Sequence, residues 1–222
     1  MKLCFLFTSL ILCVFLIAIV RGQHQNISEA LWDLQFKRGD WDYLGKNAIE
    51  RARSSIISGV FALEYAPKGR ILDIGCGEGV LSDYLNEDQK KLYLGLDLSQ
   101  EAIKLAKKKR GNLNFIQGDA LLYVPPAGEL FDVIIFNEVI YYMDHLAVLK
   151  QYSSSKYLAK NGIIVLSIWH TNKAELLKSP TVPDARAMLE SIDAISLSGA
   201  TVWPGKIKSS VHFHIEAFRV KS

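Results

Sequence analysis

Three glycines at alternate positions end a short apolar run early in the chain. The run and its glycines read Ile71-Leu72-Asp73-Ile74-Gly75-Cys76-Gly77-Glu78-Gly79, a pattern typical of a buried strand, a tight turn and the start of a helix. Because glycine tolerates positive φ and has no Cβ, such a turn lets a ligand lie against the backbone. The stretch therefore predicts a site for a nucleotide-like ligand, although glycine turns also join strands to helices where nothing binds.

A carboxylate ends the next predicted strand. Asp97 and Leu98 close the apolar run that starts at Tyr93, and an acid about twenty residues after a glycine turn can reach the hydroxyl groups of a ribose. The dinucleotide fingerprint requires Gly or Ala one place later in the turn, where this chain has Val80. A cofactor with a pyrophosphate therefore fits the turn poorly.

The order Asp-x-Gly-x-Gly-x-Gly followed by an acidic strand end resembles motif I and the ribose-binding acid of the class I S-adenosylmethionine-dependent methyltransferases. The resemblance continues through Gly118-Asp119-Ala120, Phe131-Asp132-Val133-Ile134 and Asn161-Gly162-Ile163, and so covers roughly residues 28 to 220. It implies S-adenosyl-L-methionine as the cofactor. It also implies that the Asp119 carboxylate accepts a hydrogen bond from the adenine amino group and that the Ala120 amide meets a ring nitrogen.

The residues predicted to bind this cofactor lie in the glycine turn and at the ends of the following strands. Cys76, inside the turn, is interpreted as a small buried filler and not as a nucleophile, because the sequence shows no base beside it. Asn137 ends the fourth predicted strand, at the edge where open α/β sheets bind ligands. The full predicted set is Asp73, Gly75, Cys76, Gly77, Gly79, Asp97, Leu98, Asp119, Ala120 and Asn137.

Two residues are candidates for a part in methyl transfer. Many relatives have Glu-x-x-x-His after the fourth strand, but here Glu138 is followed by Tyr142 in place of the histidine. Tyrosine titrates near about 10, so Tyr142 is expected to shape the pocket or to hydrogen-bond the acceptor. His170, at the end of the fifth predicted strand, is the candidate base, with a structural or solvent-exposed role as the alternative. A neutral amine needs mainly orientation, whereas a hydroxyl needs a base.

Strands and helices alternate along the chain, and the last two strands lie close together in sequence. This order, with the resemblance, predicts an α/β fold: a doubly wound, mostly parallel, seven-stranded Rossmann-like sheet whose last strand is antiparallel. One predicted helix, 47–65, is expected to pack on the sheet through Ile49, Ala52, Ile56, Val60 and Leu63. Other expected elements are helices at 78–85 and 145–158, and strands at 162–169, 192–198 and 211–220.

Composition limits the classes of function. The chain has 222 residues, of which 50% are hydrophobic, and a net charge of +3, which suits one catalytic domain and no nucleic-acid partner. A small-molecule methyl acceptor is what the resemblance implies. The basic run 107–110 falls at a helix end, where cations favour the dipole. His212 and His214 share the solvated face of an edge strand, so no metal is expected. Two alternatives stay open: an NAD(P)-dependent oxidoreductase, and a non-catalytic binding protein on the same fold.

The amino-terminal segment is expected to direct the chain to a membrane system. Residues 3–20 are apolar and uncharged, between Lys2 and Arg21, so residues 1–22 are expected to be a signal peptide or a signal anchor. Residues 23–66 would form a helical cap or lid containing Trp41 and Tyr43, and residues 67–222 the methyltransferase domain. Secretory-pathway localisation is expected, with membrane anchoring through residues 3–20 as the alternative; the Asn26 sequon is relevant only in a eukaryotic lumen.

Overall fold

The computed structural model describes residues 28–171, 192–202 and 211–221, and leaves the side chains of a few strand and helix residues, among them Tyr141 and His170, undescribed. The apolar amino-terminal segment, the Asn26 side chain and the stretch around Pro180 and Pro183 lie outside the described residues. Among the described helices, none combines the length and the apolar character needed to cross a bilayer.

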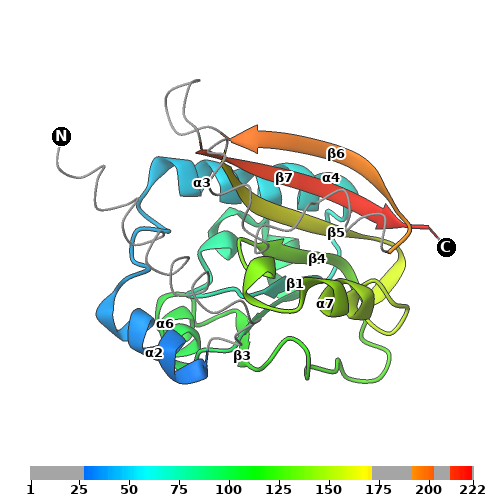
Figure 1. Ribbon diagram of the computed structural model, residues 1–222. Coiled ribbons are helices and arrows are strands. Elements are labelled where there is room, and N and C mark those ends of the chain that lie inside the picture. The colour runs from blue at the N-terminus through cyan, green and yellow to red at the C-terminus, as the bar shows by residue number, and fades with distance from the viewer. Residues whose placement is uncertain (1–27, 172–191, 203–210, 222) are drawn as a thin grey trace.

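A seven-stranded sheet forms the centre of the molecule (Figure 1). Its spatial order is β3-β2-β1-β4-β5-β7-β6, in which β7 is antiparallel to both neighbours and the pairs from β3 to β5 are parallel. The predicted doubly wound, mostly parallel sheet is therefore confirmed. The strands are β1 (Ile71–Ile74), β2 (Tyr93–Asp97), β3 (Asn114–Gln117), β4 (Phe131–Asn137), β5 (Leu158–Thr171), β6 (Ala194–Val202) and β7 (Val211–Val220).

Two strands differ from the bounds expected from sequence. β5 begins four residues earlier than expected, because Asn161 adopts a left-handed φ of 66° and the register with β4 shifts there, so the Asn-Gly pair makes an irregularity within one long strand rather than a turn before it. β6 continues to Val202, beyond the expected end at Ser198, because it pairs with β7 along its whole length.

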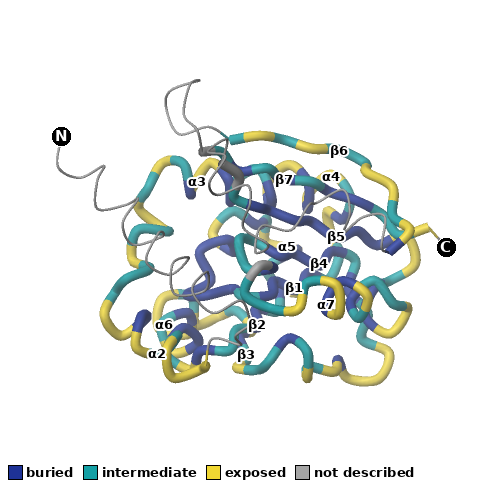
Figure 2. The backbone as a smooth tube through the Cα atoms, viewed as in Figure 1, coloured by how far each residue is buried: buried dark blue, intermediate teal, exposed yellow. Residues whose placement is uncertain are grey.

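Apolar side chains cover both faces of the sheet, as expected for buried parallel strands. One cluster joins β4 and β5 to helix α7 (His145–Tyr152) through Val148, Leu149 and Tyr152. The other joins the opposite face to helix α6 (Gln100–Lys109) and to the amino-terminal helices. Figure 2 shows the central strands buried and β6 at the more exposed edge. The sheet edge that carries the strand ends is thereby held rigidly from both sides.

The helix expected at 47–65 is continuous but changes type. It consists of α3 (Ala48–Ser55), a π-helix η1 (Ile56–Ala62) and α4 (Leu63–Tyr65). The predicted packing face was wrong: Val60 and Leu63 are 52% and 41% exposed, while Ile57 and Phe61 are buried. The wider π turn rotates the face, and the α3 part of the buried face carries charged residues.

Two other predicted helices were too long. In place of a helix at 78–85, a short 3₁₀-helix η2 (Val80–Tyr84) follows the turn, and a separate helix α5 (Glu87–Lys91) begins with a capping box between Asn86 and Gln89. Helix α7 ends at Tyr152 rather than at Leu158, because the chain turns at 153–157 to enter β5. Helix α2 (Glu29–Arg38) lies beside α6 (Figure 1).

Candidate active site

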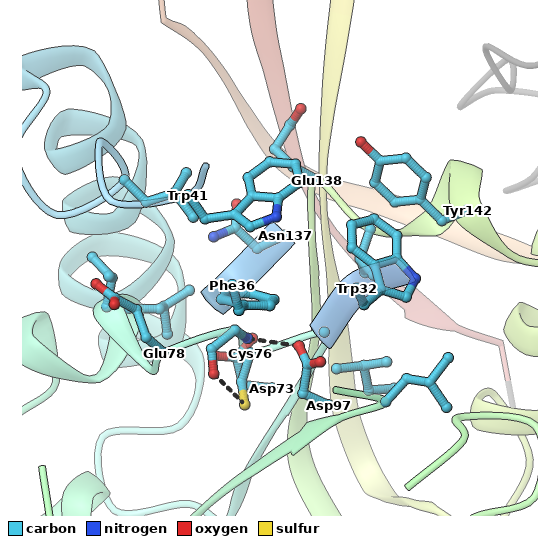
Figure 3. A pocket seen from close by; sticks show the side chains of 18 of the residues that line it. Trp32, Phe36, Trp41, Asp73, Cys76, Glu78, Asp97, Asn137, Glu138 and Tyr142 are labelled. Atoms are coloured by element: carbon cyan, nitrogen blue, oxygen red, sulfur yellow. Dashed lines mark hydrogen bonds between the residues drawn. The ribbon is translucent and has the colours of Figure 1, made fainter. Parts of the chain in front are cut away.

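A cavity of about 690 Å³ opens at the carboxyl ends of the parallel strands. That volume lies within the range of about 300 to 1,000 Å³ usual for ligand sites. Its lining divides into two parts. The turn half is made by residues 73–78, 96–98 and 118–121, and the aromatic half by Trp32, Trp41, Tyr43, Glu50, Arg53, Glu138, Tyr142, Trp169 and Phe213. Figure 3 shows Asp73, Cys76 and Asp97 at one end and Glu138 and Tyr142 at the other.

The three glycines of the turn are required for different reasons. All have positive φ: 69° at Gly75, 54° at Gly77 and 81° at Gly79. A Cβ on Gly75 would overlap Val139, and one on Gly79 would lie 2.7 Å from the Phe115 ring. A Cβ on Gly77 would meet only the Phe36 ring, at 3.5 Å, on the cavity side. Gly79 is not part of the cavity lining, so its glycine is explained by packing, whereas Gly77 leaves room for a ligand.

Asp97 connects the end of β2 to the turn. One of its carboxylate oxygens accepts the Gly77 N–H at 2.8 Å and the other accepts the Ser99 N–H at 2.8 Å. Burial raises the pKa of Asp97 to about 6, although these two N–H donors stabilise the charged form. The sequence prediction that the turn and the acid act together is thus matched by a direct contact between them.

Within the described part of the chain, Asp73 and Asn137 each present to the cavity a buried acceptor atom that has no hydrogen-bond partner. Asp73 accepts the Tyr93 hydroxyl at 2.8 Å through one oxygen, while its Oδ1 has none. The Oδ1 of Asn137 is likewise buried and unpaired. Burial raises the pKa of Asp73 to about 7. Since a buried unpaired acceptor is costly, both atoms are arranged to receive donors from a ligand.

The remaining predicted cofactor residues also lie in the turn half. Leu98, Asp119, Ala120 and Cys76 all line the cavity. Asp119 accepts the Leu121 N–H at 2.8 Å, and the Ala120 carbonyl accepts the Tyr152 hydroxyl at 2.8 Å, which fixes this loop from behind. Burial raises the pKa of the Cys76 thiol; a thiol in this state is a poor nucleophile.

Rings from five parts of the chain form the aromatic half: α2, the turn after it, the segment after β4, β5 and β7. The ring centroid of Trp32 in α2 lies 5.9 Å from that of Trp41 and 5.0 Å from that of Tyr142, which it meets edge to face. The ring centroids of Trp41 and Tyr43 are 6.2 Å apart. Trp41 donates its indole N–H to Gln35 at 3.1 Å. Trp169 of β5 and Phe213 of β7, which are paired in register, complete the wall. Figure 3 shows Trp32, Phe36 and Trp41 between the two ends of the cavity.

Sequence reasoning missed a group of buried charges in the aromatic half. Glu50 and Arg53 of α3 form an ion pair at 2.5 Å, and Arg53 also lies 4.0 Å from Glu138. Ser167 donates its hydroxyl to Glu138 at 2.8 Å. Burial raises the pKa of Glu50, and Arg53 opposes the shift. The available signal was spacing: Glu50 and Arg53 share a helical face with Ile57, so the charges belong to the buried side.

Of the two catalytic candidates, the structure describes the side chain of Tyr142 alone. Tyr142 lines the cavity, and burial raises its pKa, which keeps the hydroxyl protonated and able to donate a hydrogen bond, in line with the expected non-basic role. The backbone of His170 pairs with His212 across β5 and β7. The His170 side chain lies outside the described part of the structure, so its role as a base stays a prediction.

Two curated proteins illustrate the sequence relatives. Malonyl-[acyl-carrier protein] O-methyltransferase 2 of Ilyobacter polytropus is 31% identical over 162 residues, which are 71% of this chain and 58% of that protein. Trans-aconitate 2-methyltransferase of Afipia carboxidovorans is 28% identical over 102 residues, which are 45% of this chain and 38% of that protein. The chain therefore spans less than two thirds of the length of either relative.

Solved structures share the fold at lower identity. The N-methyltransferase NodS from Bradyrhizobium japonicum WM9, in complex with S-adenosyl-L-homocysteine, superposes with a TM-score of 0.66 at 19% identity, covering 86% of this chain and 99% of that one. The 1,6-didemethyltoxoflavin-N1-methyltransferase from Burkholderia thailandensis, with bound 1,6-didemethyltoxoflavin and S-adenosylhomocysteine, superposes with a TM-score of 0.64 at 15% identity, covering 87% of each chain.

The family itself is identified by a match to a family model. The model described as a methyltransferase domain matches residues 66–211, from just before β1 to the start of β7. This range is more than half of the chain and contains the glycine turn, Asp97, Asp119 and Asn137. The chain therefore belongs to the methyltransferase-domain family, as its glycine turn and acidic strand ends predicted.

Proposed function

We propose that this protein is an S-adenosyl-L-methionine-dependent methyltransferase that methylates a nitrogen or oxygen of a small molecule. The observation that carries the proposal is the pair of unpartnered buried acceptors, Asp73 Oδ1 and Asn137 Oδ1, beside the open space at Gly77. Such a cradle suits a ligand that brings hydrogen-bond donors against a bare backbone. The family and the structures solved with S-adenosylhomocysteine support the same cofactor.

The residues of the turn half fit this cofactor. Asp97, whose two oxygens each still have acceptor capacity beyond one N–H bond, would accept the ribose hydroxyls. Asp73 Oδ1 would accept from the amino group of the amino-acid part, and Asp119 would face the adenine. When bound, S-adenosyl-L-methionine supplies a methyl group attached to a positively charged sulfur.

The aromatic half would hold the methyl acceptor. Its rings are large, mostly buried surfaces that exclude water and restrict orientation, and orientation is the main requirement of a direct displacement. Tyr142 would donate a hydrogen bond to the acceptor. Helix α2 would act as the lid expected from sequence, because it brings Trp32 and Phe36 onto the cavity.

The two alternative functions receive no support. An oxidoreductase would need room for a pyrophosphate at position 80, where the Val80 side chain is buried and lines the cavity. A non-catalytic binding protein is expected to have lost cofactor residues, whereas the predicted set stands around one cavity, apart from the packed Gly79.

A transfer experiment tests the proposed activity. Purified protein would be incubated with methyl-labelled S-adenosyl-L-methionine and a fractionated extract of its source, and the labelled product identified. Label in a small molecule, absent with the Gly77→Val variant, is the expected result. Cofactor binding without transfer to any fraction would favour the non-catalytic alternative, and label only in protein or nucleic acid would contradict the small-molecule acceptor.

We also propose that residues 3–20 direct the chain to the secretory route, with cleavage before Gln23 or retention as an anchor. Their uncharged, apolar composition supports it. Sequencing the mature amino terminus after expression of the full chain, with a glycan test at Asn26, would separate the outcomes. Cleavage at Gln23 supports secretion, an intact terminus in carbonate-resistant membranes supports an anchor, and an intact soluble chain contradicts both.

A further inference from the structure

Two rings of the aromatic half stand on the same face of the sheet as Asp73 of the turn half. Residues paired between neighbouring strands share a face, and so do residues two apart in one strand. Asn137 of β4 is paired with Ser167 of β5. Trp169, two residues further along β5, is paired with Phe213 of β7. Asp73 shares this face because its partner in β4 stands two residues before Asn137. One face of the sheet therefore leads from the turn half directly to aromatic rings.

Most of the rings in the aromatic half keep part of their surface uncovered. The half-buried ones, all of which line the cavity, are Trp32, Trp41, Tyr43, Tyr142 and Trp169. Aromatic side chains have large apolar surfaces, and burying them stabilises a complex in the same way as it stabilises a folded core. A ligand that enters the aromatic half would therefore cover ring surface from several directions at once.

The rings are held at defined inclinations to one another. The Trp32 and Tyr142 rings meet at 81°, whereas the plane of Trp41 is inclined by 38° to that of Trp32 and by 36° to that of Tyr43. The indole N–H of Trp41 is bonded to the buried Gln35 side chain, which fixes this ring before any ligand binds. Aromatic pairs are most stable edge to face or offset-stacked. A flat aromatic ligand can adopt both arrangements here, whereas a saturated ring can adopt neither.

The charged groups of the aromatic half are engaged with partners inside the protein. Arg53 contacts Glu50 at 2.5 Å and Glu138 at 4.0 Å, and its guanidinium carbon lies 4.6 Å from the centroid of the Phe213 ring. The Glu138 carboxylate also accepts the Ser167 hydroxyl at 2.8 Å. These contacts hold the wall of the cavity together, and the Arg53 contact fixes the Phe213 ring as well. Recognition of the acceptor therefore falls mainly on the rings.

We propose that the methyl acceptor is a planar aromatic molecule whose ring lies among Trp41, Tyr142 and Trp169, with its N–H or O–H group directed toward the turn half. This inference rests on the proposed function and deepens it. In Figure 3 the rings of Trp41 and Tyr142 stand on the side of the cavity away from Asp97. A lone pair of the acceptor nitrogen or oxygen forms the new bond to the methyl carbon. The donor S–C bond breaks with its electron pair on sulfur, so that the sulfonium becomes a thioether, and the acceptor proton passes to water.

The test compares an aromatic probe with its saturated counterpart on protein loaded with S-adenosylhomocysteine. The probes are 2-naphthol and decahydro-2-naphthol, which have the same fused carbon skeleton and the same hydroxyl group. The saturated probe has at least as much apolar surface, so burial alone predicts that it binds at least as tightly. Titration calorimetry measures both affinities without any turnover. The aromatic probe is expected to bind at least about tenfold more tightly than the saturated one.

Two double variants at the same positions locate the preference. Trp41→Leu with Tyr142→Leu removes both rings and should reduce the aromatic-to-saturated ratio to below about threefold, whereas Trp41→Phe with Tyr142→Phe keeps a ring at each position and should retain at least about fivefold. Equal affinities in the wild type, tighter binding of the saturated probe, binding of neither probe, or the same ratio in both folded double variants would each overturn the inference. The wild-type comparison decides even if the variants do not fold. Failure of S-adenosylhomocysteine to bind to the wild type would instead count against the proposed function.

Discussion

The turn half and the aromatic half of the cavity are built in opposite ways. The turn half consists of residues at, and directly after, the carboxyl ends of β1, β2 and β3, and its contacts are made largely by backbone and short side chains. The aromatic half draws large side chains from α2 and the turn after it, from α3, from the segment that follows β4, and from β5 and β7. The first is specified by local sequence and suits a ligand shared by a family, whereas the second depends on tertiary assembly and can differ from one member to the next.

The largest expected effect is the loss of affinity for S-adenosylhomocysteine when a side chain fills the turn half. Gly77→Val should reduce the affinity for S-adenosylhomocysteine at least about 100-fold, because a branched Cβ would enter the cavity at a position with positive φ. Gly128→Val is the matched control: its φ is 82° and nothing lies within 4 Å of the added Cβ. Titration calorimetry on both folded variants separates backbone strain from occlusion. Equal losses in the two variants would mean that strain alone explains the result.

The next effect removes the acid that joins β2 to the turn. Asp97→Ala should weaken binding of S-adenosylhomocysteine by about 1.5 to 3 kcal/mol, the scale of a lost charge-assisted hydrogen bond with a buried partner. Asp88→Ala, an exposed acid in α5, should leave the affinity unchanged. Calorimetry is the measurement, and circular dichroism checks the fold. Unchanged affinity in a folded Asp97→Ala protein would remove the ribose role.

A smaller effect is expected with pH. Burial raises the pKa of Asp73 to about 7 and that of Asp97 to about 6. Both acids therefore gain negative charge between about pH 5.5 and 7.5. Over this range Asp73 should bind the cationic amino group, and Asp97 the ribose, more tightly, with a gain in affinity of up to about tenfold overall. The same raised pKa values make the ligand-free protein less stable at higher pH. Their contribution to the free energy of unfolding is present below about pH 4 and is lost as pH rises through 7.

Calorimetry and thermal melting across this range check both signs of the pH effect. Asp73→Asn should flatten the upper part of the binding curve, because it removes the group with the higher pKa. An affinity for S-adenosylhomocysteine that is constant between pH 5.5 and 7.5 in the wild type would contradict the assignment of these two carboxylates to the ligand.

The smallest effect concerns the connection between the halves. Asp33 of α2 accepts the Ser99 hydroxyl at 2.6 Å and the Glu101 N–H at 3.1 Å, which holds Trp32 and Phe36 over the turn half. Asp33→Asn should weaken cofactor binding only about two- to fivefold, since a partly exposed charged contact contributes about 0.2 to 1 kcal/mol. The dissociation rate of S-adenosylhomocysteine by stopped-flow fluorescence is the sensitive readout, with Asp88→Asn as the control. A rate equal to that of the control would mean that α2 is not a lid.

The same contrast explains what could be predicted from sequence. Motif spacing and the resemblance predicted a seven-stranded, mostly parallel sheet, the family and most residues of the turn half, because those residues lie at strand ends. Gly79 differs from the others: it does not line the cavity, and a Cβ at this position would lie 2.7 Å from the Phe115 ring, which spacing cannot reveal.

Only individual residues of the aromatic half were predicted from sequence. Glu50 and Arg53 were missed because the helix was assigned a different buried face, and a π-helix cannot be read from apolar periodicity. Glu138, which has a φ of 59°, is bonded to Ser167 of the neighbouring strand β5. Such features depend on segments far apart in sequence, so they become visible only in the folded chain.

Titration of the wild-type protein with S-adenosylhomocysteine, with NAD in a parallel titration, tests the central claim most directly. The unpaired acceptors at Asp73 and Asn137 and the open space at Gly77 predict one site per chain with micromolar affinity for S-adenosylhomocysteine and no heat with NAD. A folded protein that binds NAD, or that shows no heat with S-adenosylhomocysteine, would contradict the account.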